Sequence, residues 1–175
     1  MSRGYLQTFL ILSISTLGYV CTLYELRFQT LEPLKGDTET LIDFKVRLVG
    51  RERLVNGTLK CYTDIDNEFE WKINIEQHIN GDWKPLLQKL QFKTCAYFED
   101  FYTKYWASSF VDTSLPKDAC PLKKGEYYLK NVRLRSDNMM QFVKQGLNRI
   151  QLTVSKNNIT YGGFNSVVEI REVPK

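Results

Sequence analysis

Histidine is the scarcest chemically active residue in this chain of 175 residues, with His78 as its single occurrence. A metal site built from several histidines is therefore excluded, and a Ser-His-Asp triad has only one possible base. His78 comes just before a predicted hairpin tip, with no nucleophile motif beside it. We interpret it as a surface residue.

Other motifs of catalysis and metal binding are absent too. The sequence has no phosphate-binding loop and no nucleophile elbow. Asp64, Asp66 and Glu68 are spaced like calcium ligands, but the glycine and the distal glutamate of an EF-hand are missing. Glu99 and Asp100 are adjacent, so on a helix their side chains face apart, which is a poor arrangement for paired-carboxylate catalysis. We expect no enzyme, no metal site and no cofactor.

Blocks of like charge and long apolar runs are also missing. The 24 basic and 20 acidic residues are scattered and give a formal net charge of +4, unlike the footprint of a nucleic-acid-binding protein. No apolar run reaches the roughly 20 residues of a membrane-spanning helix. We therefore expect neither nucleic-acid binding nor stable membrane insertion.

The beginning of the chain has the layout of a secretory signal peptide. Arg3 supplies a short basic start, and residues 9–17 form an apolar run. A membrane anchor is the alternative, but the run is short and is interrupted by serine. We predict a signal peptide over residues 1–21 and a single domain over residues 22–175, secreted to the extracellular space.

Two glycosylation sequons agree with export. They are Asn56-Gly57-Thr58 and Asn158-Ile159-Thr160. One sequon is a weak signal, but two behind a signal peptide support each other. We predict a glycoprotein modified at Asn56 and Asn158.

The chain has few cysteines for an extracellular protein: Cys21, Cys61, Cys95 and Cys120. We favour a Cys95–Cys120 disulfide, whose loop of about 25 residues removes roughly 3 kcal/mol of unfolded-state entropy. Cys61 is then a buried free thiol or bonds another chain. If signal cleavage spares Cys21, a Cys21–Cys61 pair becomes an option.

Alternation of apolar and polar residues is the dominant pattern of the chain and predicts strands. The predicted strands are residues 41–48, 54–65, 69–76, 83–95, 126–134, 148–156 and 166–173. Asn80-Gly81 predicts a hairpin, and Gly162-Gly163 predicts a turn before the last strand. Residues 137–145 are a loop or a brief helical turn.

Residues 96–110 differ because they are rich in aromatic side chains. Phe98, Phe101, Tyr102 and Tyr105 have the spacing of one face of an α-helix, which predicts a short amphipathic helix. About seven strands with one helical insertion indicate an all-β fold, a two-sheet antiparallel immunoglobulin-like β-sandwich. The Cys…Trp…Cys spacing of antibody domains is missing, so a standard immunoglobulin domain is excluded.

A short motif carries a family resemblance. Cys120-Pro121 is followed by Lys124-Gly125 and Tyr127-Tyr128, and it lies about 25 residues after Phe92-Lys-Thr-Cys95. Over roughly residues 40–173 the chain resembles an insect family of small secreted proteins of unknown function. That family is similar to the ML lipid-recognition domain, the ganglioside activator protein and CheB-type chemosensory proteins.

The resemblance implies an ML-like sandwich whose sheets part around an apolar cavity that holds a lipid. The family motif matches only four residues of this chain, and the resemblance implies structural roles for them: Cys95, Cys120, Pro121 and Gly125. The aromatic side chains are candidates to line the cavity, with ordinary core as the alternative. These residues are Phe69, Trp71, Phe92, Phe98, Phe101, Tyr102, Tyr105 and Trp106.

Two hypotheses for function follow. The first is a secreted, non-catalytic carrier that binds a lipid or hydrophobic small molecule between its sheets, in chemosensory or reproductive extracellular fluid. The alternative is a secreted glycoprotein module that binds another protein and holds no ligand. An unpaired Cys61 that bonds another chain favours this alternative.

Overall fold

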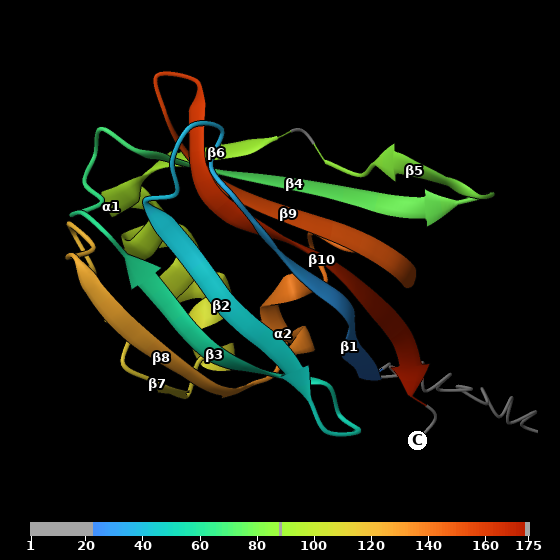
Figure 1. The fold of residues 1–175 in the computed structure, drawn as a ribbon. Helices are drawn as coiled ribbons and strands as arrows, with labels where there is room; N and C mark the ends of the chain where they lie inside the picture. The colour runs from blue at the N-terminus through green and yellow to red at the C-terminus, as the bar shows by residue number, and fades with distance from the viewer. Residues whose placement is uncertain (1–22, 88, 174–175) are drawn as a thin grey trace, which may run out of the picture.

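The computed structural model describes residues 23–87 and 89–173. The predicted signal peptide and Cys21 lie outside the described residues. Two antiparallel sheets pack face to face with a helical segment between them (Figure 1). The prediction of an all-β, two-sheet sandwich is therefore confirmed. No helix in the described part of the chain is long and apolar enough to cross a bilayer.

The first sheet has the strand order β1-β10-β9-β4-β5, and β6 pairs with β4 as well. Its strands are β1 (Leu23–Leu34), β4 (Glu70–Ile79), β5 (Asp82–Pro85), β6 (Leu90–Lys93), β9 (Gly146–Lys156) and β10 (Ile159–Val173). Alternation fixes the inward face of β4, where Trp71, Ile73 and Ile75 are buried and their neighbours are half-buried.

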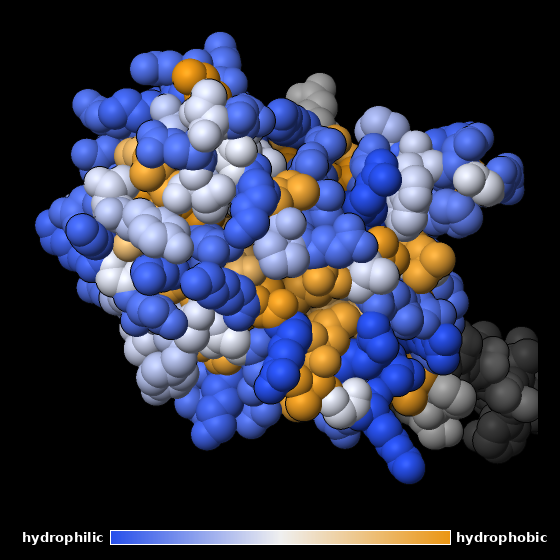
Figure 2. Space-filling model, viewed as in Figure 1, coloured by the Kyte–Doolittle hydropathy of each residue, from blue (hydrophilic) through white to orange (hydrophobic). Residues whose placement is uncertain are grey.

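The second sheet has the order β2-β3-β8-β7. Its strands are β2 (Ile42–Val49), β3 (Leu54–Cys61), β7 (Asp112–Thr113) and β8 (Gly125–Val132). Figure 2 shows that the face viewed in Figure 1 is largely hydrophilic, with apolar side chains gathered in a stripe near the end of β2. On β2, Val46 and Leu48 are only partly buried.

The strand β1 was not predicted from the sequence. It lies at the edge of the first sheet and pairs with β10 alone. A bulge between Phe28 and Thr30 shifts its register, so its apolar residues do not alternate along the whole strand. Leu26 and Phe28 nevertheless face the core and are buried.

The predicted turn at Gly162-Gly163 is wrong. The chain turns earlier, at Asn157 and Asn158, which have left-handed φ angles of 51° and 63°. Gly162 lies inside β10, where a Cβ atom would collide with the carbonyl oxygen of Ile42. A glycine is required because the two sheets approach each other backbone to backbone at this point.

The Asn80-Gly81 hairpin is confirmed, since Ile79 pairs with Asp82 across it and both turn residues have positive φ angles. The predicted return strand of residues 83–95 is divided into β5 and β6, which both pair with β4. For residues 137–145 the sequence left a loop or a brief helical turn open. The structure has a short helix at the start of this segment, α2 (Ser136–Met139).

The helical insertion starts with α1 (Thr94–Ala96), continues as η1 (Tyr97–Trp106) and ends with the 3₁₀ turn η2 (Ala107–Ser109). η1 is a π-helix: the N–H of Ala107 donates to the carbonyl of Tyr102, five residues earlier. The insertion is confirmed, but the prediction of α-helical spacing is wrong. The wider winding redistributes its side chains between two faces.

The sandwich is closed along one side by backbone hydrogen bonds and filled by η1 on the other. At the closed side, Leu41 N–H donates to Tyr161 O at 2.9 Å and Asp37 N–H donates to Thr160 O at 2.8 Å. η1 lies between the sheets in Figure 1, behind β2 and β3. The apolar faces of both sheets therefore meet the insertion rather than only each other.

Candidate functional site

The candidate site is the apolar space between the two sheets. Twelve side chains line it, and every one is leucine or an aromatic residue. The first sheet contributes Trp71, Leu152 and Phe164, and the second contributes Phe44, Leu59 and Leu129. The remaining space has a volume of about 40 Å³. A water molecule needs roughly 10–15 Å³ measured in this way, so the void is small.

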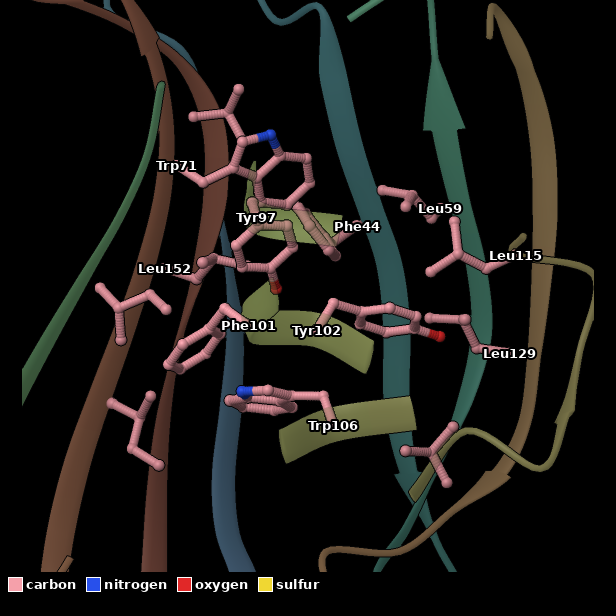
Figure 3. Packing of buried hydrophobic residues seen from close by; sticks show 14 of the residues in the cluster. Phe44, Leu59, Trp71, Tyr97, Phe101, Tyr102, Trp106, Leu115, Leu129 and Leu152 are labelled. Atoms are coloured by element: carbon pink, nitrogen blue, oxygen red, sulfur yellow. The ribbon is translucent and has the colours of Figure 1, made fainter. Parts of the chain in front are cut away.

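Aromatic side chains of η1 fill most of this space (Figure 3). The ring of Tyr97 stacks on Trp71 with centroids 4.3 Å apart and planes inclined by 9°. Phe98 meets the same indole edge-on at 5.4 Å. Figure 3 shows Tyr102 directed toward Leu129 of the second sheet. The insertion thus packs against both walls.

The two buried tryptophans of the site differ in hydrogen bonding. Trp71 Nε1 donates to Thr94 Oγ1 at 3.1 Å, and that hydroxyl donates in turn to the carbonyl of Phe69 at 3.4 Å. Trp106 is 7% exposed, and its Nε1 has no hydrogen-bond partner among the described residues. A buried donor without a partner is costly, so Trp106 marks a place where an acceptor is missing.

The two phenols at the site stay protonated at physiological pH. Burial raises the pKa of Tyr97 far above its usual range, with a smaller contribution from Tyr102. Burial also raises the pKa of Tyr102 to about 12. The site therefore offers neutral O–H and N–H groups on an apolar wall, which suits a neutral apolar ligand that carries a hydrogen-bond acceptor.

The eight aromatic residues predicted to line a cavity divide into three groups. Trp71, Phe98, Tyr102 and Trp106 line the interior space. Phe69 lies elsewhere and packs edge-on against Tyr161 at 5.8 Å. The other three, which are Phe92, Phe101 and Tyr105, line a groove on the outer side of η1.

The sequence prediction missed two aromatic residues of the insertion that line the interior, Tyr97 and Phe110. On η1, Tyr97, Tyr102 and Trp106 are five and four residues apart, which is the periodicity of π-helical winding, and Phe110 follows the 3₁₀ turn η2. That spacing was present in the sequence, but α-helical spacing was tested instead. Phe101 and Tyr105 were consequently assigned to the wrong face.

Residues 69–150 match the model of a family described as a protein of unknown function (DUF1091). No curated protein matches the chain. The matched region runs from the residue before β4 into β9, so it contains the insertion and all eight predicted aromatic residues. It leaves out β1, β2, β3 and β10, which complete the sandwich.

A disulfide joins the two ends of the helical insertion. Cys95 and Cys120, the favoured pair, are bonded, with Cα atoms 4.9 Å apart. They flank η1, η2 and β7, so the whole insertion forms one cross-linked loop. The peptide bond between Cys120 and Pro121 is cis.

Cys61 is a free thiol buried at the end of β3, 1% exposed. Burial raises the pKa of Cys61 to about 12, and the charge of Asp64 adds to this shift. A buried, protonated thiol cannot bond another chain without local opening. The alternative Cys21–Cys61 pair involves a residue outside the described range.

The two sequons differ in accessibility. Asn158 is exposed in the turn between β9 and β10. Asn56 is half-buried on the central strand β3, and its Oδ1 accepts a hydrogen bond from the N–H of Asn131 at 3.2 Å. Asn158 is therefore the more accessible acceptor for a glycan.

A larger surface cleft of about 620 Å³ lies between the start of β1 and the end of β8. Four of its charged side chains form two ion pairs: Lys130 with Asp112 at 3.4 Å, and Arg133 with Glu52. Among residues 23–87 and 89–173, no group of three or more His, Cys, Asp or Glu side chains is placed to hold a metal ion. The interior aromatic space remains the best candidate site.

Proposed function

We propose that the protein is a secreted, non-catalytic carrier that binds a lipid or another hydrophobic small molecule between its two sheets. The observation that carries this proposal is the buried indole N–H of Trp106, which has no hydrogen-bond partner among the described residues and belongs to a space lined by leucine and aromatic side chains. A ligand with an acceptor oxygen beside an alkyl or aromatic body satisfies both features.

The space must enlarge for such a ligand. Ligand pockets typically measure roughly 300–1,000 Å³, whereas the void measures about 40 Å³. Within the insertion, η1 is the part that can give way, because it lies between the sheets and is a strand of neither, whereas β7 pairs with β8. The Cys95–Cys120 disulfide keeps the two ends of the insertion together while η1 moves. Ligand entry by outward displacement of η1 is therefore part of the proposal.

Features of the sequence support the extracellular setting. The signal-like start, the disulfide and the exposed sequon at Asn158 are typical of an exported glycoprotein. The resemblance to ML-like and CheB-type proteins supports a chemosensory or reproductive fluid. The rival module that binds only proteins loses its main argument, because Cys61 is buried.

Native mass spectrometry of the protein secreted from eukaryotic cells tests the proposal first. We expect a bound apolar molecule that organic extraction removes. In parallel, the stripped protein is titrated with N-phenyl-1-naphthylamine, and fatty alcohols and the matching alkanes are used to displace it. A protein that carries no ligand and binds no probe at about 100 μM is not a carrier.

A matched pair of variants tests the role of the Trp106 N–H. Trp106→Phe removes this donor, which has no partner among the described residues, and we expect weaker binding of a fatty alcohol but little change for the alkane of the same length. Trp71→Phe is the control, since its N–H is already bonded to Thr94. Equal losses in both variants contradict a specific role for Trp106.

A further inference from the structure

A second aromatic surface lies on the opposite side of η1 from the interior space. It is a groove of about 440 Å³ between β6, η1 and the segment after α2. This volume lies within the usual range for a small-molecule site. Leu90 and four aromatic rings form its apolar surface, and the rings are those of Phe92, Phe101, Tyr105 and Phe142.

The rings contact one another and form a corner. Phe101 lies 5.1 Å from Phe92, 5.1 Å from Tyr105 and 5.6 Å from Phe142, measured between centroids. Tyr105 and Phe142 meet at 4.8 Å with their planes at 90°. Phe92, Tyr105 and Phe142 are only partly buried, so their surfaces remain open to a ligand. Aromatic faces carry negative electrostatic potential, which attracts cations.

Two carboxylates beside the groove also favour a cation. Glu99 and Asp100 line it from η1, and both are exposed. Neither has an ion pair with another of the described residues. Lys104 already places its ammonium 5.1 Å from the centroid of the Tyr105 ring. The ammonium group of Lys104 therefore already makes a cation–π contact with one ring of the groove.

We propose that this groove binds a small organic ammonium ion, with its N-alkyl groups against the rings of Tyr105 and Phe142 and its charge facing Glu99 and Asp100. Cation–π attraction accounts for the contact with the rings, and the two carboxylates supply a salt-dependent attraction. The occupant is a quaternary or fully protonated amine rather than a neutral apolar molecule. The site is distinct from the interior space and does not depend on the carrier function.

Choline and its uncharged isostere 3,3-dimethyl-1-butanol test this directly, by NMR titration of the folded protein. We expect choline to bind at least about tenfold more tightly, with shifts at Tyr105 and Phe142. Equal binding of the two compounds, no choline binding, or shifts that map elsewhere would each overturn the proposal. Equal binding would instead indicate an apolar docking groove.

Variants separate the ring and charge contributions. Glu99→Gln combined with Asp100→Asn is expected to weaken choline binding severalfold and to flatten its salt dependence. Lys104→Met removes the competing ammonium and is expected to strengthen binding. Glu126→Gln, at an exposed carboxylate on β8, is the control and should change nothing. A Lys104→Met variant that binds choline less well contradicts the competition on which the proposal rests.

Discussion

Replacing Trp71 and Trp106 separately by phenylalanine makes the same volume change at two buried sites that differ in hydrogen bonding. Both side chains belong to one core cluster, and they are 2% and 7% exposed. A phenyl ring in place of an indole leaves roughly 40 Å³ empty, which costs about 1 kcal/mol. The lost apolar burial costs about 1 kcal/mol more. These two costs are shared by both variants.

The hydrogen bonds give the two variants different stabilities. Trp71→Phe also loses the bond from Nε1 to Thr94 Oγ1, which adds about 1 kcal/mol to its destabilisation. Trp106→Phe removes a buried donor that has no partner among the described residues, and this change stabilises the folded state by about 1 kcal/mol. We therefore expect losses of about 3 kcal/mol at Trp71 and about 1 kcal/mol at Trp106. The difference is about thirtyfold in the folding equilibrium.

Equilibrium unfolding in guanidinium chloride, followed by far-ultraviolet circular dichroism, measures both values. The comparison holds when the two variants and the parent protein share one m-value, so that the same surface is exposed on unfolding. Equal destabilisation, or a greater loss at Trp106, would refute the reasoning. Trp106 Nε1 would then have a partner, and the premise of the proposed ligand contact would be lost.

Three further predictions concern the cysteines and the sequon. Replacing Cys95 and Cys120 by serine should cost roughly 3 kcal/mol by loop entropy over their separation of 25 residues, measured by chemical unfolding. Cys61, with its pKa raised from 9.0 to about 12, stays protonated when folded while the unfolded thiol ionises. Parent stability should therefore fall relative to Cys61→Ala by about 1 kcal/mol between pH 9 and pH 10, and parallel curves would contradict this. Thr160→Ala should remove one glycan by mass while it keeps Asn158 in its left-handed turn, and an unchanged mass means that Asn158 is unmodified.

The fold was predictable where one rule dominates. Strict alternation along β4, from Trp71 to Ile75, placed its buried face correctly because a strand repeats every two residues. The strand β1 was missed although Tyr24, Leu26 and Phe28 alternate with polar residues, and the register shifts only after Phe28. The turn predicted at Gly162 was wrong for another reason: a glycine can serve a turn or a close approach of two strands, and only the position of Ile42 distinguishes them.

The site was predictable in composition but not in arrangement. The aromatic richness of residues 96–110 correctly marked the insertion, and four of the eight predicted residues line the interior. The division of the aromatic side chains between two faces depends on whether each backbone N–H bonds to the carbonyl four residues earlier, as in an α-helix, or five residues earlier, as in a π-helix. Local spacing alone does not decide between the two. Whether the sheets touch or part is also invisible in the alternation, because inward residues look alike in both cases.

The winding of η1 links the two proposed sites physically. Tyr102 and Trp106 face the interior space, whereas Phe101 and Tyr105 line the outer groove, on the same ten-residue helix. A ligand that enters between the sheets must move η1, and this shifts Phe101 and Tyr105 relative to Phe142, which lies on another segment. Binding at one site should therefore change affinity at the other by the same factor in both directions. Choline titrations with and without a saturating fatty alcohol measure that factor. A factor of one would mean that the ligand enters without displacing η1, and the proposed entry route would be wrong.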